Sequence, residues 1–161
     1  MRKRDNIKYD GIIIGDGPGY LELKKFADSV NNELGQEVIH FTGSQIDVNK
    51  FYMAGDCVLG TGRVAIEAMA AFKKVIAAGN SGYYGFTTSE NFKEAWSTYF
   101  GDHDYKFDND PKYLYEDMKE YYLNKEYYDK DIYDLYDKSR VLFDIFKVTS
   151  ELIDIYIDAF N

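Results

Sequence analysis

The sequence predicts an α/β fold, in which helices cover a parallel sheet and a helical tail follows. Two patterns lead to this prediction. Up to about residue 88, short apolar runs alternate with segments of helical periodicity, and beyond it only the helical periodicity recurs. Strands and helices that alternate with short connections favour parallel pairing, with helices on both faces of the sheet. We expect a single domain over residues 1–161, with an α/β core at 9–88 and a mostly helical part at 89–161.

The first half of the expected core has a signal for each element. "YDGIII" at Tyr9–Ile14 predicts a buried strand, and "LELKKFADSVNNEL" at 21–34 places its apolar residues on one helical face. Gly35 is placed to end this helix. "EVIHF" at 37–41 predicts the second strand, in which the histidine is a strand residue rather than a catalytic base. Asp47 can cap a short helix after this strand.

The second half of the core repeats the alternation. "CVL" at 57–59 and "VIAA" at 75–78 predict the third and fourth strands, and a helix is expected between them at Val64–Phe72. "GNSGYYG" at Gly79–Gly85 predicts a flexible loop, which either touches a ligand or only connects elements. In parallel sheets, ligands bind beyond the carboxyl ends of the strands, and the glycine-rich turns of this sequence fall there.

Helical signals dominate the rest of the chain. Ser89 can cap a helix, and Asp110–Pro111 is a helix-start signal. Apolar residues recur at helical spacing over 132–146 and again over 148–159, which predicts two further helices. A soft internal boundary is expected in the polar stretch 101–110. Ten of the sixteen tyrosines lie beyond residue 100, and at helical spacing such side chains favour half-buried packing over sugar binding.

Composition indicates a soluble globular protein, because 45% of the residues are hydrophobic and 29% are charged. No apolar run approaches the roughly 20 residues of a membrane helix. The basic start "MRKRDNIKYD" has no apolar stretch behind it, so we do not expect secretion. The single cysteine, Cys57, cannot form an internal disulfide and is predicted to be a core residue of a reduced, cytoplasmic protein.

The formal net charge of −9 is distributed unevenly. Residues 1–100 carry 11 basic and 12 acidic side chains, whereas residues 101–161 carry 8 and 16. An acidic tail argues against nucleic-acid binding, because phosphate contacts need a basic face. The nearly neutral first hundred residues remain compatible with a small anionic ligand.

Two glycine turns are the candidate sites. "GDGPG" at Gly15–Gly19 follows a strand and precedes a helix, so its backbone N–H groups could approach a phosphate at the helix start. Its spacing departs from the dinucleotide pattern G-x-G-x-x-G, because position 20 is tyrosine. The competing interpretation is a tight strand-to-helix turn with Pro18 at the first helical position.

The second turn, "GTGRVAIE" at Gly60–Glu67, is the sharper signal. Its glycines free the backbone to wrap an anion at a helix start, and Arg63 could add a charge-assisted contact. Glu67 lies one turn further along the same face, where a carboxylate could accept hydrogen bonds from two neighbouring ribose hydroxyls. The competing interpretation is a surface i,i+4 pair between Arg63 and Glu67.

Other chemistries lack a signal in the sequence. It contains no nucleophile elbow, P-loop, C-x-x-C pair or zinc-ligand cluster, and His103 has no neighbours at metal-ligand spacing. We therefore expect no metal and no cofactor, and we assign no catalytic residue.

Four segments together resemble a known family. "IIIGDGP", "VIHFTG", "GTGRVAIEAMA" and "KKVIAAG", in this order and spacing, resemble the nucleotide-sugar-binding C-terminal half of GT-B glycosyltransferases, most closely the group 1 (glycosyltransferase family 4-like) enzymes. The resemblance covers roughly Tyr9–Gly85, and the later helices follow the family more loosely. It implies a Rossmann-like parallel sheet and a transferase that takes its sugar from a nucleoside-diphosphate sugar.

The resemblance also implies roles for individual residues. Glu67 aligns with the glutamate that holds the ribose hydroxyls of the donor nucleotide. The remaining implied contacts with the nucleotide sugar lie in three turns: Gly60, Thr61, Gly62 and Arg63 near the diphosphate and sugar; Gly15, Asp16, Gly17 and Pro18 facing the domain cleft; and Phe41, Thr42, Gly43 and Ser44 near the base.

The chain departs from the family in three ways. Many members have a glutamate that contacts the donor sugar eight positions before the ribose glutamate, and here that position is Leu59. The usual first strand, with an arginine and a lysine that clamp the diphosphate, is expected to be absent. The N-terminal acceptor domain is expected to be absent too, so we expect a fragment, a shortened chain or a partner subunit.

Three hypotheses follow from the sequence. The first is the donor-binding domain of a glycosyltransferase, which needs an acceptor domain or partner chain and has little transfer activity alone. The full enzyme would associate with a membrane only peripherally, if at all. The second is a non-catalytic accessory subunit with a glycosyltransferase-like fold. The third is a two-domain epimerase of similar architecture.

Overall fold

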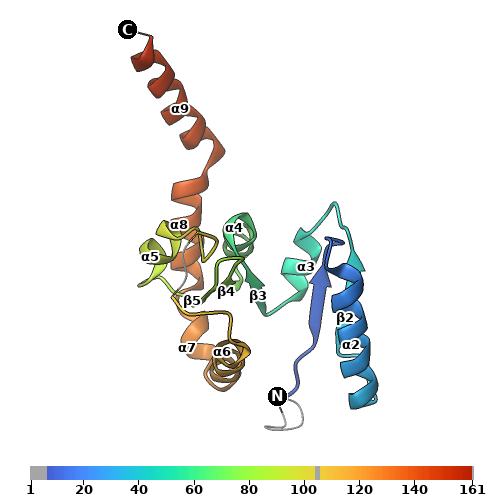
Figure 1. The fold of residues 1–161 in the computed structure, drawn as a ribbon. Helices are drawn as coiled ribbons and strands as arrows, with labels where there is room; N and C mark the ends of the chain where they lie inside the picture. The colour runs from blue at the N-terminus through green and yellow to red at the C-terminus, as the bar shows by residue number, and fades with distance from the viewer. Residues whose placement is uncertain (1–6, 104–105, 161) are drawn as a thin grey trace. The chain divides into compact units, whose positions relative to one another are not determined.

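The computed structural model describes residues 7–103 and 106–160. The chain divides into two compact units, one ending at Val48 and the other beginning at Asn49, and each is described by itself. The fold is mixed α/β, with small sheets flanked by helices and a helical C-terminal tail (Figure 1). The start of the chain, on which the prediction about secretion depends, falls in 1–6 and lies outside the described residues.

The first unit is a strand–helix–strand arrangement. β1 (Gly11–Ile14) and β2 (Ile39–Gly43) pair in parallel, and α2 (Tyr20–Leu34) connects them. α2 ends at Gly35, as the sequence predicted, with the glycine in the left-handed conformation at φ 65°. The side chain of Asn31 then joins α2 to β2, because its Oδ1 accepts the Val38 N–H at 2.9 Å and its Nδ2 donates to the Ile39 carbonyl at 2.9 Å.

The second unit contains a three-stranded sheet. β3 (Cys57–Gly60) pairs in parallel with β4 (Lys74–Ala78), and β4 pairs with β5 (Tyr83–Thr87) in the antiparallel direction. α3 (Asn49–Ala54) precedes β3, and α4 (Gly62–Ala70) connects β3 to β4. All four strands predicted from the sequence are therefore present, but they are grouped in two sheets.

β5 shows that the prediction of a loop at Gly79–Gly85 was wrong over its second half. A tight turn closed by the Gly79 N–H and the Gly82 carbonyl at 2.9 Å reverses the chain, and residues 83–87 are all buried. The glycines concealed the strand signal of the aromatic residues beside them. β5 occupies the second edge of β4 and makes the sheet of the second unit mixed rather than parallel.

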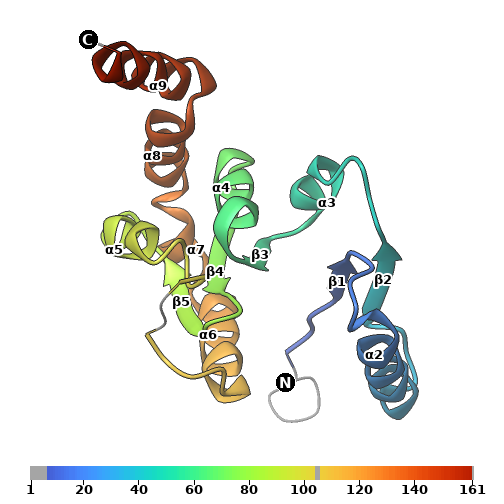
Figure 2. The ribbon, with the colours of Figure 1, turned by 45° about the horizontal axis from the view of Figure 1, so that its top comes forward.

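Helices cover the sheet of the second unit. α4 lies against β3 and β4, and α5 (Phe92–Ser97) and α6 (Pro111–Leu123) lie against β5 (Figure 1). α7 (Lys125–Asp129) follows α6, and α8 (Ile132–Phe143) packs against α4 (Figure 2). The most deeply buried apolar residues come from α4, β4, α5 and the segment that follows α5, namely Ala65, Ala68, Met69, Val75, Ala77, Ala95 and Phe100.

The predicted start of α6 is present in the structure, whereas the predicted cap of α5 is not. Asp110 caps α6 with Pro111 in its first turn, as predicted. At α5 the N-cap position belongs to Asn91 and not to Ser89, whose N–H donates to Asp131 instead. Cys57, predicted as a core residue, is partly buried and packs against the apolar cluster of the second unit, and burial raises the pKa of its thiol to about 12.

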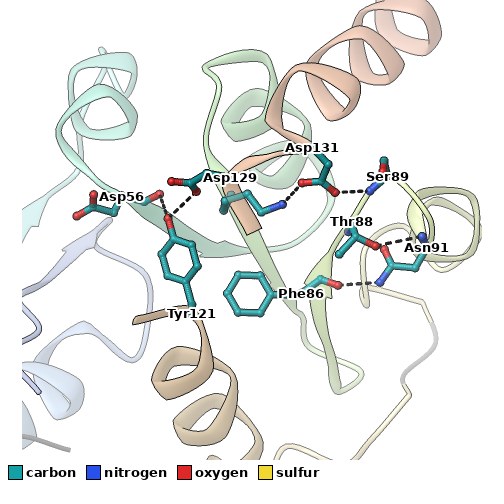
Figure 3. Close-up of polar contacts among 9 residues, drawn as sticks. Asp56, Phe86, Thr88, Ser89, Asn91, Tyr121, Asp129 and Asp131 are labelled. Carbon is teal, nitrogen blue, oxygen red and sulfur yellow. Dashed lines mark hydrogen bonds and ion pairs between the residues drawn. The ribbon is translucent and has the colours of Figure 1, made fainter. Parts of the chain in front are cut away.

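Polar contacts attach the tail helices to the sheet (Figure 3). The Tyr121 hydroxyl of α6 donates to the Asp56 carbonyl at 3.3 Å and lies 3.2 Å from the Asp129 carboxylate. The Asn91 amide donates to the carbonyl of Phe86 at 2.8 Å. Tyr121 also belongs to an apolar cluster with Ile76, Tyr83 and Phe86, so this tyrosine packs in the core as the sequence indicated.

The last helix, α9 (Ile145–Ala159), differs from the others. The sequence placed Phe146 in the preceding helix, but Asp144 separates α8 from α9 and caps α9. None of its described residues is buried, although most of them are apolar. Across the described residues, no helix combines the length and apolar character that crossing a membrane requires.

Candidate functional site

The predicted site residues divide between the two units. The turn at Gly15–Pro18 and the pair Gly43–Ser44 belong to the first unit, whereas Gly60–Arg63 and Glu67 belong to the second. Each group is therefore considered within its own unit.

The first unit brings the two turns at the ends of β1 and β2 together. The Gly15 N–H donates to the Gly43 carbonyl at 2.9 Å, and the Gly17 carbonyl accepts the Tyr20 N–H at the start of α2. A Cβ built on Gly15, Gly17 or Gly43 would meet no atom within 4 Å, so the space above these residues is open. The neighbouring Asp16, Pro18 and Ser44 are exposed.

Two details of this unit differ from the expectation. α2 begins at Tyr20 after Gly19, so Pro18 does not occupy the first helical position. Phe41 is covered by α2, because the Tyr20 ring meets it edge-on at a centroid distance of 5.4 Å and Lys24 lies over it. His40 lies within β2, as the sequence indicated.

The turn before α4 in the second unit is filled by the segment that follows α5. The Thr61 hydroxyl lies 3.1 Å from the Tyr99 carbonyl and 2.9 Å from the Phe100 carbonyl, and the Gly62 N–H donates to the Tyr99 carbonyl at 3.1 Å. The donors of Thr61 and Gly62 therefore serve the fold itself. No local pattern indicates that Tyr99 and Phe100 belong to this turn, since they are about 38 residues away along the chain.

Gly62 has a steric reason to be glycine. Its φ is 53°, and a Cβ at this position would approach the Tyr99 ring to 2.8 Å. The tight turn and the close ring together account for the glycine at position 62, independently of any ligand.

Glu67 is held from two sides. Its Oε1 lies 3.5 Å from the Arg63 Nε, and its Oε2 accepts the Tyr52 hydroxyl at 3.0 Å. The i,i+4 pair is thus present, but the Arg63 side chain is 85% exposed and such pairs contribute only about 0.3–0.5 kcal/mol. Tyr52, on α3, was missed by the sequence analysis, because nothing in the pattern of a short helix shows a contact 15 residues away.

A pocket of about 310 Å³ lies beside this carboxylate. Its walls come from α3 and α4, and Glu67 is the acidic residue among the residues that line it: Asn49, Met53, Glu67, Ala70 and Ala71. The volume is at the lower end of the range for small-ligand pockets. The carboxylate thus faces a concave, mostly apolar surface of a size that can receive a sugar ring.

A larger pocket, of about 480 Å³, lies between the start of α5 and α8. Acidic and basic side chains line it together, among them Glu90, Lys93, Asp137 and Lys138. It contains none of the predicted site residues, and its mixed charges select no ligand class. We therefore place the candidate site at the smaller pocket, where an oriented carboxylate is present.

The position aligned with the family's sugar-binding glutamate is also visible. Leu59 lies in β3 and is exposed. Within the part of the chain that the structure describes, no group of three or more histidine, cysteine, aspartate or glutamate side chains could hold a metal ion. Comparisons of the chain with protein families, with curated proteins and with solved structures gave no match.

Proposed function

We propose that the chain is the donor-binding domain of a glycosyltransferase and that it binds a nucleoside-diphosphate sugar through Glu67. One observation carries the proposal: a carboxylate with both oxygens already oriented lines a pocket one turn into α4. A carboxylate can accept about four hydrogen bonds, so two neighbouring hydroxyls of a ribose can share Glu67 with Tyr52 and Arg63.

The charge at the start of α4 supports the same ligand class. The Arg63 guanidinium extends into solvent from the first turn of the helix and can reach an anion there. Because Thr61 and Gly62 donate to carbonyl groups of the protein, Arg63 would be the main contact of this turn with the diphosphate. Binding the leaving diphosphate would stabilise the negative charge that develops during sugar transfer.

The rest of the enzyme is part of the proposal as well. The acceptor would bind to a further domain or partner chain, and we expect the isolated chain to show little or no transfer. We assign no catalytic residue and place the protein in the cytoplasm.

Titration calorimetry with UDP, GDP and ADP tests the proposal. We expect at least one of them to bind the wild-type chain, and we expect Glu67→Ala to weaken that binding about tenfold or more, since hydrogen bonds to a charged group contribute about 1.5–3 kcal/mol. Glu151→Ala is the matched control, because Glu151 also forms an i,i+4 pair, with Lys147 on α9. The proposal fails if no nucleotide binds, or if both variants bind like the wild type.

The alternative of a non-catalytic accessory subunit is favoured by α9. This helix exposes Ile145, Phe146, Ile155 and Ile157, and apolar surface of this extent is typical of an association surface. Size-exclusion chromatography after co-expression with products of adjacent genes tests it. A stable complex that binds no nucleotide would favour the accessory subunit over the donor-binding domain.

A further inference from the structure

Tyr52 contacts Glu67 but is not among the residues that line the candidate pocket. Tyr52 is only 5% exposed and is the buried residue of α3. Its hydroxyl donates to Glu67 Oε2 at 3.0 Å, whereas the pocket walls are formed by other residues of α3 and by α4. Tyr52 therefore contacts the carboxylate without lining the space in front of it.

The two partners of Glu67 differ in how firmly they can hold it. Arg63 is almost fully exposed, so its pair with Glu67 is weakened by solvent and by salt. Tyr52 has its ring packed in the interior, and a buried ring allows few orientations of its hydroxyl group. The fixed contact is thus the one from Tyr52 to Oε2, and it determines the plane of the carboxylate.

The Tyr52 hydroxyl is a permanent donor at neutral pH. Burial, with the hydrogen bond to Glu67 as a second cause, raises the pKa of Tyr52 to about 12. The hydroxyl therefore donates to Glu67 before any ligand arrives.

We propose that Tyr52 is a positioning residue that fixes the Glu67 carboxylate for the two ribose hydroxyls, and that it thereby sets a preference for ribonucleotides over 2′-deoxyribonucleotides. This inference rests on the proposed function. A carboxylate that accepts from both the 2′ and 3′ hydroxyls needs its plane aligned with the diol, and a freely rotating carboxylate would accept from one hydroxyl as readily as from two. Fixing the plane therefore strengthens the contact that the 2′-deoxy ligand lacks.

The test compares matched ligands on the full chain. UDP, GDP and ADP, each with its 2′-deoxy counterpart, are titrated into the wild type, Tyr52→Phe and Glu67→Gln. We expect the wild type to bind the ribonucleotide roughly ten to a hundred times more tightly, because the lost hydrogen bond is to a charged group. Tyr52→Phe should lower this ratio roughly threefold to tenfold with little change for the deoxy ligand, and Glu67→Gln should bring it close to one.

The ratio separates positioning from a structural effect. A variant that is only destabilised loses affinity for the ribonucleotide and for its 2′-deoxy counterpart to the same extent, so the ratio of the two affinities stays that of the wild type. This result for Tyr52→Phe would overturn the inference. Tyr121→Phe is the matched control, because Tyr121 is also 5% exposed and its hydroxyl also lies near a carboxylate, 3.2 Å from Asp129, which does not line the pocket. Its ratio should equal that of the wild type.

The remaining outcomes distinguish the inference from the proposed function. If Glu67→Gln abolishes the preference while Tyr52→Phe retains it in full, the role of Tyr52 is refuted and the donor site stands. If the wild type binds no nucleotide, or binds both ligands equally, the donor site itself is refuted, and the role of Tyr52 with it.

Discussion

Lys74 and Asp131 form an ion pair that joins β4 to the start of α8. The Lys74 side chain is fully buried, and its Nζ donates to Asp131 Oδ1. The second oxygen of the same carboxylate accepts the Ser89 N–H at 2.7 Å (Figure 3). One side chain thus connects β4, α8 and the segment before α5.

The first prediction concerns the removal of this carboxylate. Asp131→Ala leaves a buried ammonium group without its partner, so we expect the free energy of unfolding to fall by about 3 kcal/mol. Lys74→Met combined with Asp131→Ala should cost less than the two single changes together, because the double variant buries no unpaired charge. Urea unfolding followed by circular dichroism measures all three.

Asp134→Ala serves as the control for this cycle. Asp134 lies in the same first turn of α8 but is exposed, so its loss should change the free energy of unfolding by less than about 0.5 kcal/mol. Strict additivity of the two substitutions would show that Lys74 and Asp131 do not interact in the folded protein.

The second prediction concerns pH. Asp117 on α6 is half-buried, and this desolvation raises the pKa of its carboxyl group, with Glu120 and Glu116 adding to the increase. A carboxyl group with a raised pKa in the folded state binds protons more tightly there than in the unfolded chain. Its contribution to stability is therefore present at acid pH and is lost as the pH rises through the folded-state pKa.

The variant Asp117→Asn isolates this contribution. It keeps an acceptor for the Tyr83 hydroxyl, which lies 2.6 Å from Asp117 Oδ2, but cannot titrate. As the pH falls from 7 toward the ordinary aspartate pKa of 3.8, the wild type should gain stability relative to Asp117→Asn, as measured by urea unfolding at each pH. A difference that stays constant, or one that changes in the opposite direction, would contradict the raised pKa.

Local signals in the sequence predicted much of the fold. Gly35 ends α2 and Asp110 caps the start of α6, and both roles were predicted from neighbouring residues in the chain. The four predicted strands needed only their own apolar runs to be recognised. β5 was missed because the turn glycines before it and Gly85 within it hid a buried strand.

The candidate site was predictable only in part, for a related reason. The place of Glu67 one turn into a helix follows from the spacing of neighbouring residues. The Tyr52 hydroxyl on Glu67 and the Tyr99 carbonyl on Gly62 join residues 15 and 37 positions apart, and no local pattern encodes these contacts. They depend on tertiary packing, which the periodicity of a single sequence does not specify.

The third prediction concerns Gly62. Gly62→Ala introduces a side chain at a positive φ and places a Cβ against the Tyr99 ring, so we expect a loss of about 2–4 kcal/mol in the free energy of unfolding. Gly55→Ala is the control, since a Cβ at Gly55 would meet its nearest atoms at 3.6 Å, an ordinary contact distance. Thermal unfolding of both variants checks the prediction. Similar midpoints for the two would show that the Gly62 turn can rearrange without cost.

The fourth prediction concerns the cap of α9. Asp144 Oδ1 accepts the N–H groups of Phe146 and Lys147 at 3.0 and 3.1 Å, and loss of such a cap costs about 1 kcal/mol. Since none of the described residues of α9 is buried, loss of the cap should destabilise this helix alone. Asp144→Ala should therefore speed amide hydrogen exchange within α9 and leave the free energy of global unfolding unchanged.

Asp110→Ala is the informative contrast to Asp144→Ala. Asp110 caps α6 through the Lys112 N–H at 2.9 Å, and α6 packs against β5 and buries Tyr121. Loss of this cap should therefore lower the free energy of global unfolding. If the Asp144 variant lowers global stability by as much as the Asp110 variant, α9 unfolds together with the sheet, and its exposed apolar face does not make it an independent helix.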